Sequence, residues 1–178
     1  GGLAVSKRTA KGSGAWEMSE FHSPDLAAEY LWPRMTTSGV DHSVMHVIAM
    51  TMPVANGGVI YQGLDGALLY SKSIDGGATW DPQHLLIDGV SSSYYTSISA
   101  DAYEIKAQGD NVAILYGDSW QDLGLLKSTD GGSTWNRTLI WECPYPFWVT
   151  GTPTDTFYCA DGAHALAFDQ NGMVHVVF

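Results

Sequence analysis

The sequence predicts an all-β fold built from repeated units, and three observations support this prediction. An octapeptide occurs as Ser73–Trp80 and again, 55 residues later, as Ser128–Trp135. Each copy follows an apolar run that ends in Lys-Ser, and the rest of the chain consists of short apolar segments separated by Gly, Asn and Asp. A fixed period of this size is typical of repeat folds, in which each unit buries its apolar face against its neighbours.

The repeated pattern Ser-x-Asp-x-Gly-x-Thr-Trp resembles the Asp-box of the sialidase-like and BNR-repeat β-propeller family. In that family the box forms the hairpin turn between the third and fourth strands of a four-stranded antiparallel blade. The resemblance therefore implies a β-propeller, of which this chain covers about three blades' worth. The matching positions are Ser73, Asp75, Gly77, Thr79 and Trp80 in one copy and Ser128, Asp130, Gly132, Thr134 and Trp135 in the other.

The residue types of the box suit a closed turn. Asp75 and Asp130 can accept hydrogen bonds from backbone N–H groups one to three residues further on. Gly77 and Gly132 can adopt a positive φ, where a Cβ would clash. We expect each box tryptophan to cover its turn and to anchor it to the next blade, which makes the box a structural element rather than a catalytic one.

A decayed third copy precedes these two. Aligning Trp16 with Trp135 places Thr9 at the serine position but Lys11 at the aspartate position. Because a lysine side chain has no acceptor, we expect this box to lack its central hydrogen bonds.

With the boxes as anchors, the chain divides into parts of one β-propeller domain. Residues 1–21 would end one blade, 33–88 and 103–142 would form two full blades, and 163–178 would start another. The chain would thus begin and end inside blades, so we expect the missing strands in a longer protein or a larger assembly. The expected strands are Arg34–Thr37, Val44–Met50, Ala67–Lys72, His84–Ile87, Tyr103–Ala107, Val112–Tyr116, Leu123–Lys127, Thr138–Trp141, Ala163–Phe168 and Val174–Phe178.

The composition excludes several partners. The chain carries 8 basic and 19 acidic residues, a net charge of −11, which disfavours nucleic acid and anionic membrane surfaces as partners. No apolar run is long enough to insert into a bilayer. Charged residues make up only 15% of the chain and aromatic residues 12%, a balance that suits a secreted or cell-surface β-protein.

The cysteines and histidines give no metal or cofactor site. Cys143 and Cys159 bracket a loop rich in Pro and aromatic residues, and they either form a disulfide or remain two unrelated thiols. No further Cys or suitably spaced His accompanies them, so we expect no metal and no cofactor. His46 and His175 lie in expected second strands, where we interpret them as packed side chains.

The family resemblance also raises the question of enzymatic activity. Sialidases clamp the substrate carboxylate with three arginines and use a Tyr–Glu pair as nucleophile and an Asp as acid/base. The only arginines here are Arg8, Arg34 and Arg137, and only Arg34 begins an expected innermost strand. We therefore expect no catalytic residue in this segment. The alternative is a sialidase-like exo-glycosidase whose catalytic set is completed outside it.

Two aspartates form a candidate ligand site with Arg34. Asp101 and Asp161 each follow an alanine and precede an expected innermost strand, which would place both carboxylates on one face near the central opening. There they could bind a cation or orient a sugar hydroxyl. The alternative is that both are simply turn residues.

The leading hypothesis is a non-catalytic secreted or cell-surface propeller region that binds a glycan or a protein, or serves as a scaffold. A purely structural role in an assembly is a further alternative. The chain is similar to propeller regions of large exported Bacteroidota proteins, which often precede a sorting domain for type IX secretion. Candidate stacking residues on the loops are Tyr94, Tyr95, Trp120, Phe147 and Trp148.

Overall fold

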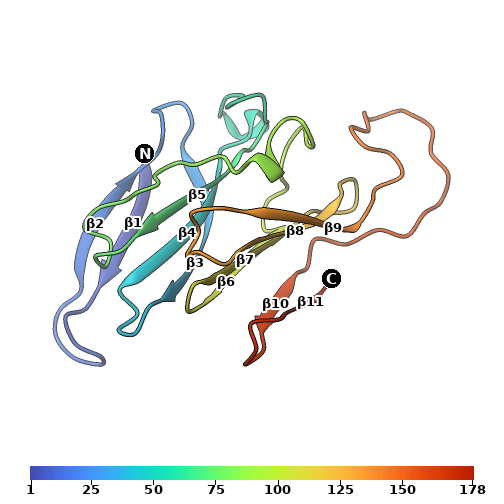
Figure 1. Cartoon of the computed structure of the whole chain (residues 1–178). Coiled ribbons are helices and arrows are strands. Elements are labelled where there is room, and N and C mark those ends of the chain that lie inside the picture. The colour runs from blue at the N-terminus through green and yellow to red at the C-terminus, as the bar shows by residue number, and fades with distance from the viewer.

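The computed structural model describes residues 1–178 and is all-β, as predicted (Figure 1). Eleven strands form four antiparallel sheets, joined by turns and long connections. No helix in the chain has the length and apolar character needed to span a membrane. The strands are β1 (Gly2–Lys7), β2 (Glu17–His22), β3 (Tyr30–Ser38), β4 (Val44–Thr51), β5 (Leu68–Ser73), β6 (Tyr103–Gln108), β7 (Asn111–Tyr116), β8 (Leu123–Ser128), β9 (Asn136–Trp141), β10 (Ala165–Phe168) and β11 (Val174–Val177).

Each sheet is a simple meander, in which every strand pairs with the next one along the chain. The orders are β1-β2, β3-β4-β5, β6-β7-β8-β9 and β10-β11. The sheets follow one another across the molecule in chain order (Figure 1). Their first strands are neighbours, since β3 contacts β6 and β6 contacts β10. The predicted four-stranded unit is complete in β6–β9, and the four sheets do not close into a ring.

The strand predicted at His84–Ile87 is reduced to a single bridge between Leu85 and Tyr70 of β5. Two local features interrupt the extended backbone that a strand needs. Pro82 has no N–H to donate to the ladder, and His84 has a positive φ of 60°. The second sheet therefore has three full strands where four were predicted.

β3 also differs from its prediction, because it begins at Tyr30 rather than at Arg34. A β-bulge between Leu31 and Arg34 shifts its register against β4, and Trp32 at this bulge has a φ of 47°. The bulge turns the backbone so that Arg34 continues the strand in a new register.

The core lies between the sheets. The larger cluster joins β2, the second sheet and the third sheet and includes Ile48, Tyr70 and Ile105. A smaller cluster, which includes Leu115 and Leu166, joins the third sheet to β10. Because β4 and β7 are covered on both faces, they are buried almost along their whole length and show no alternation.

Candidate functional site

Both Asp-box turns form the hydrogen bonds that their sequence predicts. In the first, Asp75 Oδ1 accepts from the N–H groups of Ala78 and Thr79, each at 2.9 Å. Thr79 Oγ1 donates to Asp75 Oδ2 at 2.7 Å, and the Ser73 hydroxyl donates to Oδ1 at 2.8 Å while accepting from Gly77 N. The Ala78 donor lies three residues after the aspartate, within the predicted range, and the Thr79 donor lies one residue beyond that range.

The second turn repeats this arrangement around Asp130. Its carboxylate accepts from the N–H groups of Ser133 at 3.0 Å and Thr134 at 2.9 Å, and from the Thr134 hydroxyl at 2.6 Å. Hydrogen bonds from the threonine hydroxyl and backbone hold the pKa of Asp130 far below its usual range, and the same bonds lower the pKa of Asp75. Both carboxylates are thus committed to their turns as anions.

The box tryptophans pack in the opposite direction to the one predicted. Trp80 contacts Phe21 of β2 at a ring-centroid distance of 4.6 Å, and Trp135 meets Tyr70 of β5 edge-on at 5.0 Å. Each tryptophan therefore anchors its turn to the preceding sheet rather than to the next one. The reason is that the preceding sheet presents a large aromatic side chain beside the turn.

Lysines at the ends of three strands reach from each sheet toward the next. Lys7 Nζ donates to the Gly76 carbonyl at 3.4 Å, and Lys127 Nζ donates to the Gly172 carbonyl at 2.8 Å. Lys72 takes the corresponding place, with its Nζ beside Gly131. These contacts and the tryptophans make the box region an interface between sheets.

The decayed box retains a turn but not the aspartate bonds. Ala10 and Ser13 form an isolated bridge there. Lys11 occupies the aspartate position, where its side chain offers no acceptor to the N–H groups of the turn. Trp16 is exposed, with the Arg8 guanidinium 4.6 Å from the centre of its ring.

Arg34 and Asp101 are brought together, but Asp161 does not join them. Arg34 Nη2 donates to Asp101 Oδ1 at 2.5 Å, and the guanidinium lies over the ring of Tyr103. Asp161 instead accepts from Ala163 N at 2.8 Å within its own turn and makes no ion pair. The structure thus gives an ion pair and a separate turn residue in place of one shared carboxylate site.

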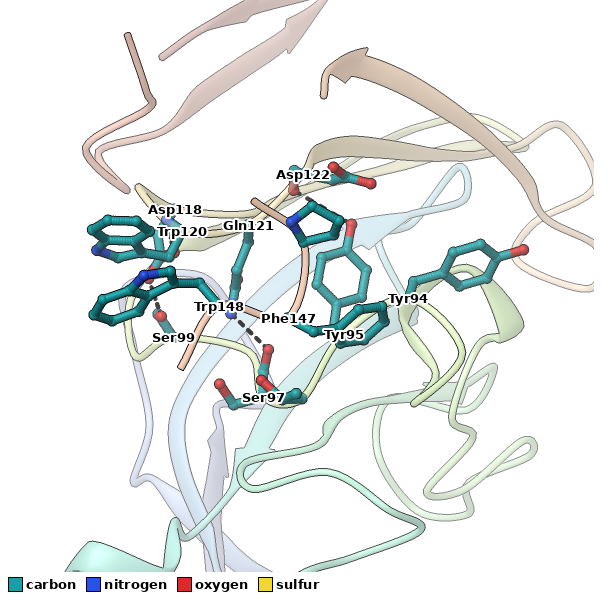
Figure 2. Close-up of a pocket in the computed structure, with 12 residues that line it drawn as sticks. Tyr94, Tyr95, Ser97, Ser99, Asp118, Trp120, Gln121, Asp122, Phe147 and Trp148 are labelled. Carbon is teal, nitrogen blue, oxygen red and sulfur yellow. Dashed lines mark hydrogen bonds between the residues drawn. The ribbon is translucent and has the colours of Figure 1, made fainter. Parts of the chain in front are cut away.

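The five aromatic residues singled out in the sequence all line one pocket (Figure 2). The pocket lies between three connections, residues 91–102, 117–122 and 142–164. Its volume is about 190 Å³, below the roughly 300–1,000 Å³ of sites for drug-sized ligands, which leaves room for a single ring-sized group. The residues that line it are Tyr94, Tyr95, Thr96, Ser97, Ser99, Asp118, Trp120, Gln121, Asp122, Pro146, Phe147 and Trp148.

An aromatic cluster fixes the connection 142–164 at the rim of this pocket. Trp148 stacks on Trp120 at a centroid distance of 4.2 Å and an interplanar angle of 18°. Phe157 packs edge-on against Trp120 and parallel to Trp141 of β9. The connection is therefore attached to the third sheet through the aromatic side chains of Trp148 and Phe157. Phe147, which precedes Trp148 in the chain, remains 48% exposed.

Polar side chains of the connection 117–122 face the other two connections. The Ser99 hydroxyl donates to Asp118 Oδ2, whose Oδ1 accepts from Trp120 N at 3.1 Å. Gln121 Nε2 donates to the Ser97 carbonyl at 2.7 Å, and Gln121 Oε1 is buried without a hydrogen-bond partner. Sequence reasoning missed these residues, because the segment between β7 and β8 has the composition of an ordinary turn.

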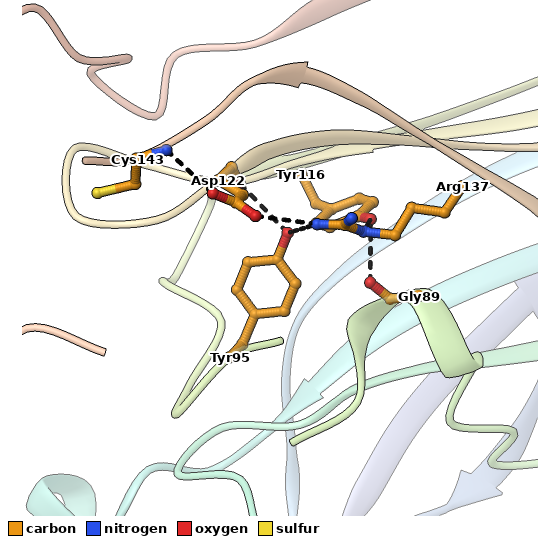
Figure 3. A network of polar contacts seen from close by, with 6 residues as sticks. All are labelled: Gly89, Tyr95, Tyr116, Asp122, Arg137 and Cys143. Atoms are coloured by element: carbon orange, nitrogen blue, oxygen red, sulfur yellow. Dashed lines mark hydrogen bonds and ion pairs between the residues drawn. The ribbon is translucent and has the colours of Figure 1, made fainter. Parts of the chain in front are cut away.

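A partly buried network beneath the pocket is centred on Asp122 and Arg137 (Figure 3). Arg137 Nη2 donates to Asp122 Oδ2 at 3.1 Å and to the Tyr95 hydroxyl at 3.3 Å, and its Nε donates to the Tyr116 hydroxyl at 3.2 Å. Asp122 Oδ1 accepts from Cys143 N at 3.0 Å. Burial raises the pKa of both tyrosines, which stay protonated. The network ties β9 to all three connections.

Of the two alternatives left open for the cysteines, the structure has the second, with Cys143 and Cys159 as two free thiols. Cys143 is buried, where its backbone N–H bonds to Asp122, and burial raises the pKa of its thiol. Cys159 is exposed on the returning arm of the connection, next to Trp120 and Phe157. The two cysteines lie toward opposite ends of the connection, so the Cys143 side chain is buried and the Cys159 side chain is exposed to solvent.

His46 is a packed side chain, as predicted. It is fully buried, and its two ring nitrogens are hydrogen-bonded to the Ser38 hydroxyl at 2.9 Å and the Tyr70 hydroxyl at 2.8 Å. Burial lowers the pKa of His46 to about 4. His175 of β11 is exposed and lies 3.5 Å from an Asp169 carboxylate oxygen.

No group of three or more His, Cys, Asp and Glu side chains is placed to hold a metal ion. The aromatic pocket, which combines exposed rings with polar side chains, is the candidate binding site of the chain. No family model, no curated protein and no solved structure matches this chain.

Proposed function

We propose that the chain is a non-catalytic region of a sialidase-like β-propeller that binds a glycan or a protein segment. In this proposal the four sheets are consecutive blades, and the connections 91–102, 117–122 and 142–164 form a binding face. The meander order, the adjacency of β3, β6 and β10, and the two Asp-box turns between sheets support the propeller.

The aromatic pocket carries the functional part of the proposal. Phe147 is 48% exposed and Tyr94 is 40% exposed, while the partly buried network of Arg137 and Asp122 fixes the backbone beneath them. Exposed aromatic rings on a rigid support favour binding, because little side-chain entropy is lost when a ligand stacks on them.

The alternative of a sialidase-like glycosidase receives less support from the geometry. Arg34 lies within β3, the first strand of its sheet, and its guanidinium is paired with the Asp101 carboxylate. Arg137 is held by Asp122 and two tyrosine hydroxyls, so neither guanidinium is free to clamp a substrate carboxylate. Because this alternative needs catalytic residues outside the segment, it would be favoured by hydrolysis of a fluorogenic sialoside by a longer protein that contains this chain.

The composition supports a location outside the cell. Few charges, many aromatic residues and a net charge of −11 suit a secreted or surface-bound β-protein. We accordingly place the region within a larger exported protein or assembly, where other parts of the propeller would cover its outer sheets.

Binding is tested with the wild-type chain and two variants on an array of glycans and a library of peptides. Phe147→Ala removes an exposed ring of the pocket, whereas Tyr158→Ala removes a ring from the same connection that is 94% exposed and lies outside the pocket. We expect Phe147→Ala to weaken binding and Tyr158→Ala to leave it unchanged. Equal binding by both variants would contradict the proposal, as would an absence of any ligand.

A further inference from the structure

The charge of the aromatic pocket is negative. No Lys, Arg or His side chain lines it, whereas Asp118 and Asp122 both do. Arg137 neutralises Asp122 at 3.1 Å, but Asp118 is bonded only to the Ser99 hydroxyl and the Trp120 backbone N–H. An anionic ligand would therefore meet an uncompensated carboxylate and find no cation to pair with.

Arg137 does not change this conclusion, although it lies close to the pocket. Its guanidinium donates to Asp122 and to two tyrosine hydroxyls, and the ring of Tyr94 covers it at 4.4 Å. Few N–H groups of Arg137 are left for a ligand, and the Asp122 carboxylate already balances its positive charge. Releasing it would leave the Asp122 carboxylate unpaired in a half-buried site.

Gln121 gives the pocket a hydrogen-bond acceptor that is oriented and unused. Its Nε2 donates to the Ser97 carbonyl at 2.7 Å, which fixes the amide, and its Oε1 is buried with no partner. A buried acceptor without a donor is costly, so a ligand hydroxyl that donates to it would contribute favourably to binding once a small shift of the lining side chains exposes the oxygen. Sugar hydroxyls are such donors, and carboxylates are not.

Phe147 is presented by a strained backbone. Its φ of 58° lies in the left-handed region, which a residue with a large side chain rarely adopts, and its ring is half-exposed at the pocket. Outliers of this kind are concentrated at ligand sites, where the surrounding structure holds them in place. The ring and its neighbour Trp148 offer apolar faces of the kind on which the C–H face of a pyranose stacks.

From these observations we infer that the pocket binds an uncharged pyranose ring, which donates a hydroxyl to Gln121 Oε1 and stacks against Phe147, and that it rejects anionic sugars, sialic acid included. This inference rests on the proposed function and specifies the ligand class of the same site. The volume of about 190 Å³ suits one ring, with the remaining residues of a glycan chain outside the pocket.

Matched pairs of neutral and anionic sugars test the inference. The wild-type chain is titrated with the methyl glycosides of glucose, galactose and mannose, with the corresponding uronic acids, and with N-acetylneuraminic acid, followed by saturation-transfer NMR. We expect at least one neutral glycoside to bind and its uronate to bind about fivefold more weakly, the effect of one like charge at about 4 Å in water. Asp118→Asn removes the negative charge of the pocket wall and should reduce the difference in affinity between the neutral glycoside and its uronate.

Three variants assign the effect to the pocket. Gln121→Met keeps the side-chain size but removes the acceptor, and Phe147→Ala removes the stacking ring, so both should weaken the neutral glycoside about threefold to tenfold. Tyr158→Ala, on the same connection but outside the pocket, should bind like the wild type.

The possible failures are distinguishable. If a uronate or N-acetylneuraminic acid binds as tightly as the neutral sugar and Phe147→Ala still weakens it, the charge inference is wrong and the proposed function stands. If no sugar binds but peptides bind through Phe147, the ligand class is wrong and a binding function remains. If neither sugars nor peptides bind, both proposals fail.

Discussion

Gly132 serves two purposes at once in the second Asp-box turn. Its φ of 86° lies in the left-handed region, where a side chain is strained, and a Cβ built on it would overlap the Tyr70 hydroxyl of the preceding sheet. The box glycine thus permits both the turn and the close approach of two sheets. At the level of single residues, the motif encodes an interface as well as a hairpin.

We predict that Gly132→Ala destabilises the chain much more than Gly76→Ala. Gly76 also has a positive φ, of 71°, but a Cβ there would meet nothing within 4 Å, so its variant isolates the conformational cost of about 1–2 kcal/mol. Gly132→Ala adds an overlap with Tyr70 worth roughly a further 1–3 kcal/mol. Chemical denaturation of both variants measures the difference, and equal losses would contradict the interface role.

Residue-level reasoning from the sequence succeeded where a side chain acts on its own turn. The roles of Asp75 and Asp130 follow from the chemistry of a carboxylate beside backbone N–H groups, and the structure confirms them. The direction in which Trp80 packs was predicted wrongly, because it depends on how sheets stack. Gln121 was missed, because an isolated glutamine in a turn gives no signal until its partners are known.

At the scale of elements, the strand β8 holds the last hairpin through one side chain. Lys127 Nζ donates to the Gly172 carbonyl in the turn between β10 and β11 at 2.8 Å, and it lies near the ring of Phe168. A hydrogen bond from a charged donor is stronger than a neutral one, and this one is partly buried. The two-stranded sheet β10-β11 has few backbone bonds of its own, so this contact adds to the smaller apolar cluster that attaches it to the third sheet.

We expect Lys127→Met to loosen that hairpin without unfolding the rest. Methionine keeps the apolar stem but cannot donate, so amide hydrogen exchange in β11 should become about tenfold faster, the effect of losing about 1.4 kcal/mol. Lys106→Met is the control, because Lys106 contacts only the Glu104 carboxylate on an exposed face of β6. Uniform acceleration across all sheets would show a global rather than a local effect.

Element boundaries were predictable wherever apolar residues were continuous. β4 and β7 coincide with their predicted segments to within a residue, since both are covered on both faces and carry apolar side chains at most positions. The fourth strand of the second sheet was predicted from His84–Ile87, yet the structure retains only the bridge at Leu85. Hydrophobic content alone could not reveal that Pro82 and the positive φ of His84 break the ladder there.

For the molecule as a whole, stability should depend on pH in two windows. Burial lowers the pKa of His46 to about 4 and also lowers the pKa values of His84 and His164. Between pH 6.5 and about 4 the unfolded chain therefore binds more protons than the folded chain, so stability falls as the pH falls. Below about pH 4 the carboxylates of Asp75 and Asp130 protonate in the unfolded state first, and their turns lose further stability.

We predict that His46→Gln reduces the loss of stability between pH 6.5 and about 4. Between about pH 7.5 and pH 5 the wild type should lose on the order of 2 kcal/mol through His46, because its unfolded imidazole is protonated at pH 5 and its folded one is not. Glutamine does not titrate, although it keeps donor and acceptor groups toward Ser38 and Tyr70. Urea denaturation at both pH values provides the comparison, and an unchanged slope would contradict the assignment.

The whole-molecule arrangement was the least predictable level. The all-β class and the meanders followed from the repeat, but the pocket depends on three connections that are distant in the sequence, at 91–102, 117–122 and 142–164. The sequence indicated its aromatic residues and not their convergence. Only the packed structure shows that Asp122 and Arg137 hold these connections together.

The contacts between sheets also give the stack a direction. At the first two junctions the earlier sheet contributes a lysine and an aromatic ring, and the later sheet contributes a glycine of its Asp-box turn and the box tryptophan, as in Lys7 with Gly76 and Tyr70 with Trp135. Such head-to-tail contacts are not self-complementary, so a unit cannot be inverted, but it can be followed by another of the same kind. Duplication of one whole period would therefore preserve every junction. Loss of part of a period would place the lysine and aromatic ring of one sheet against a sheet that lacks the Asp-box turn they contact.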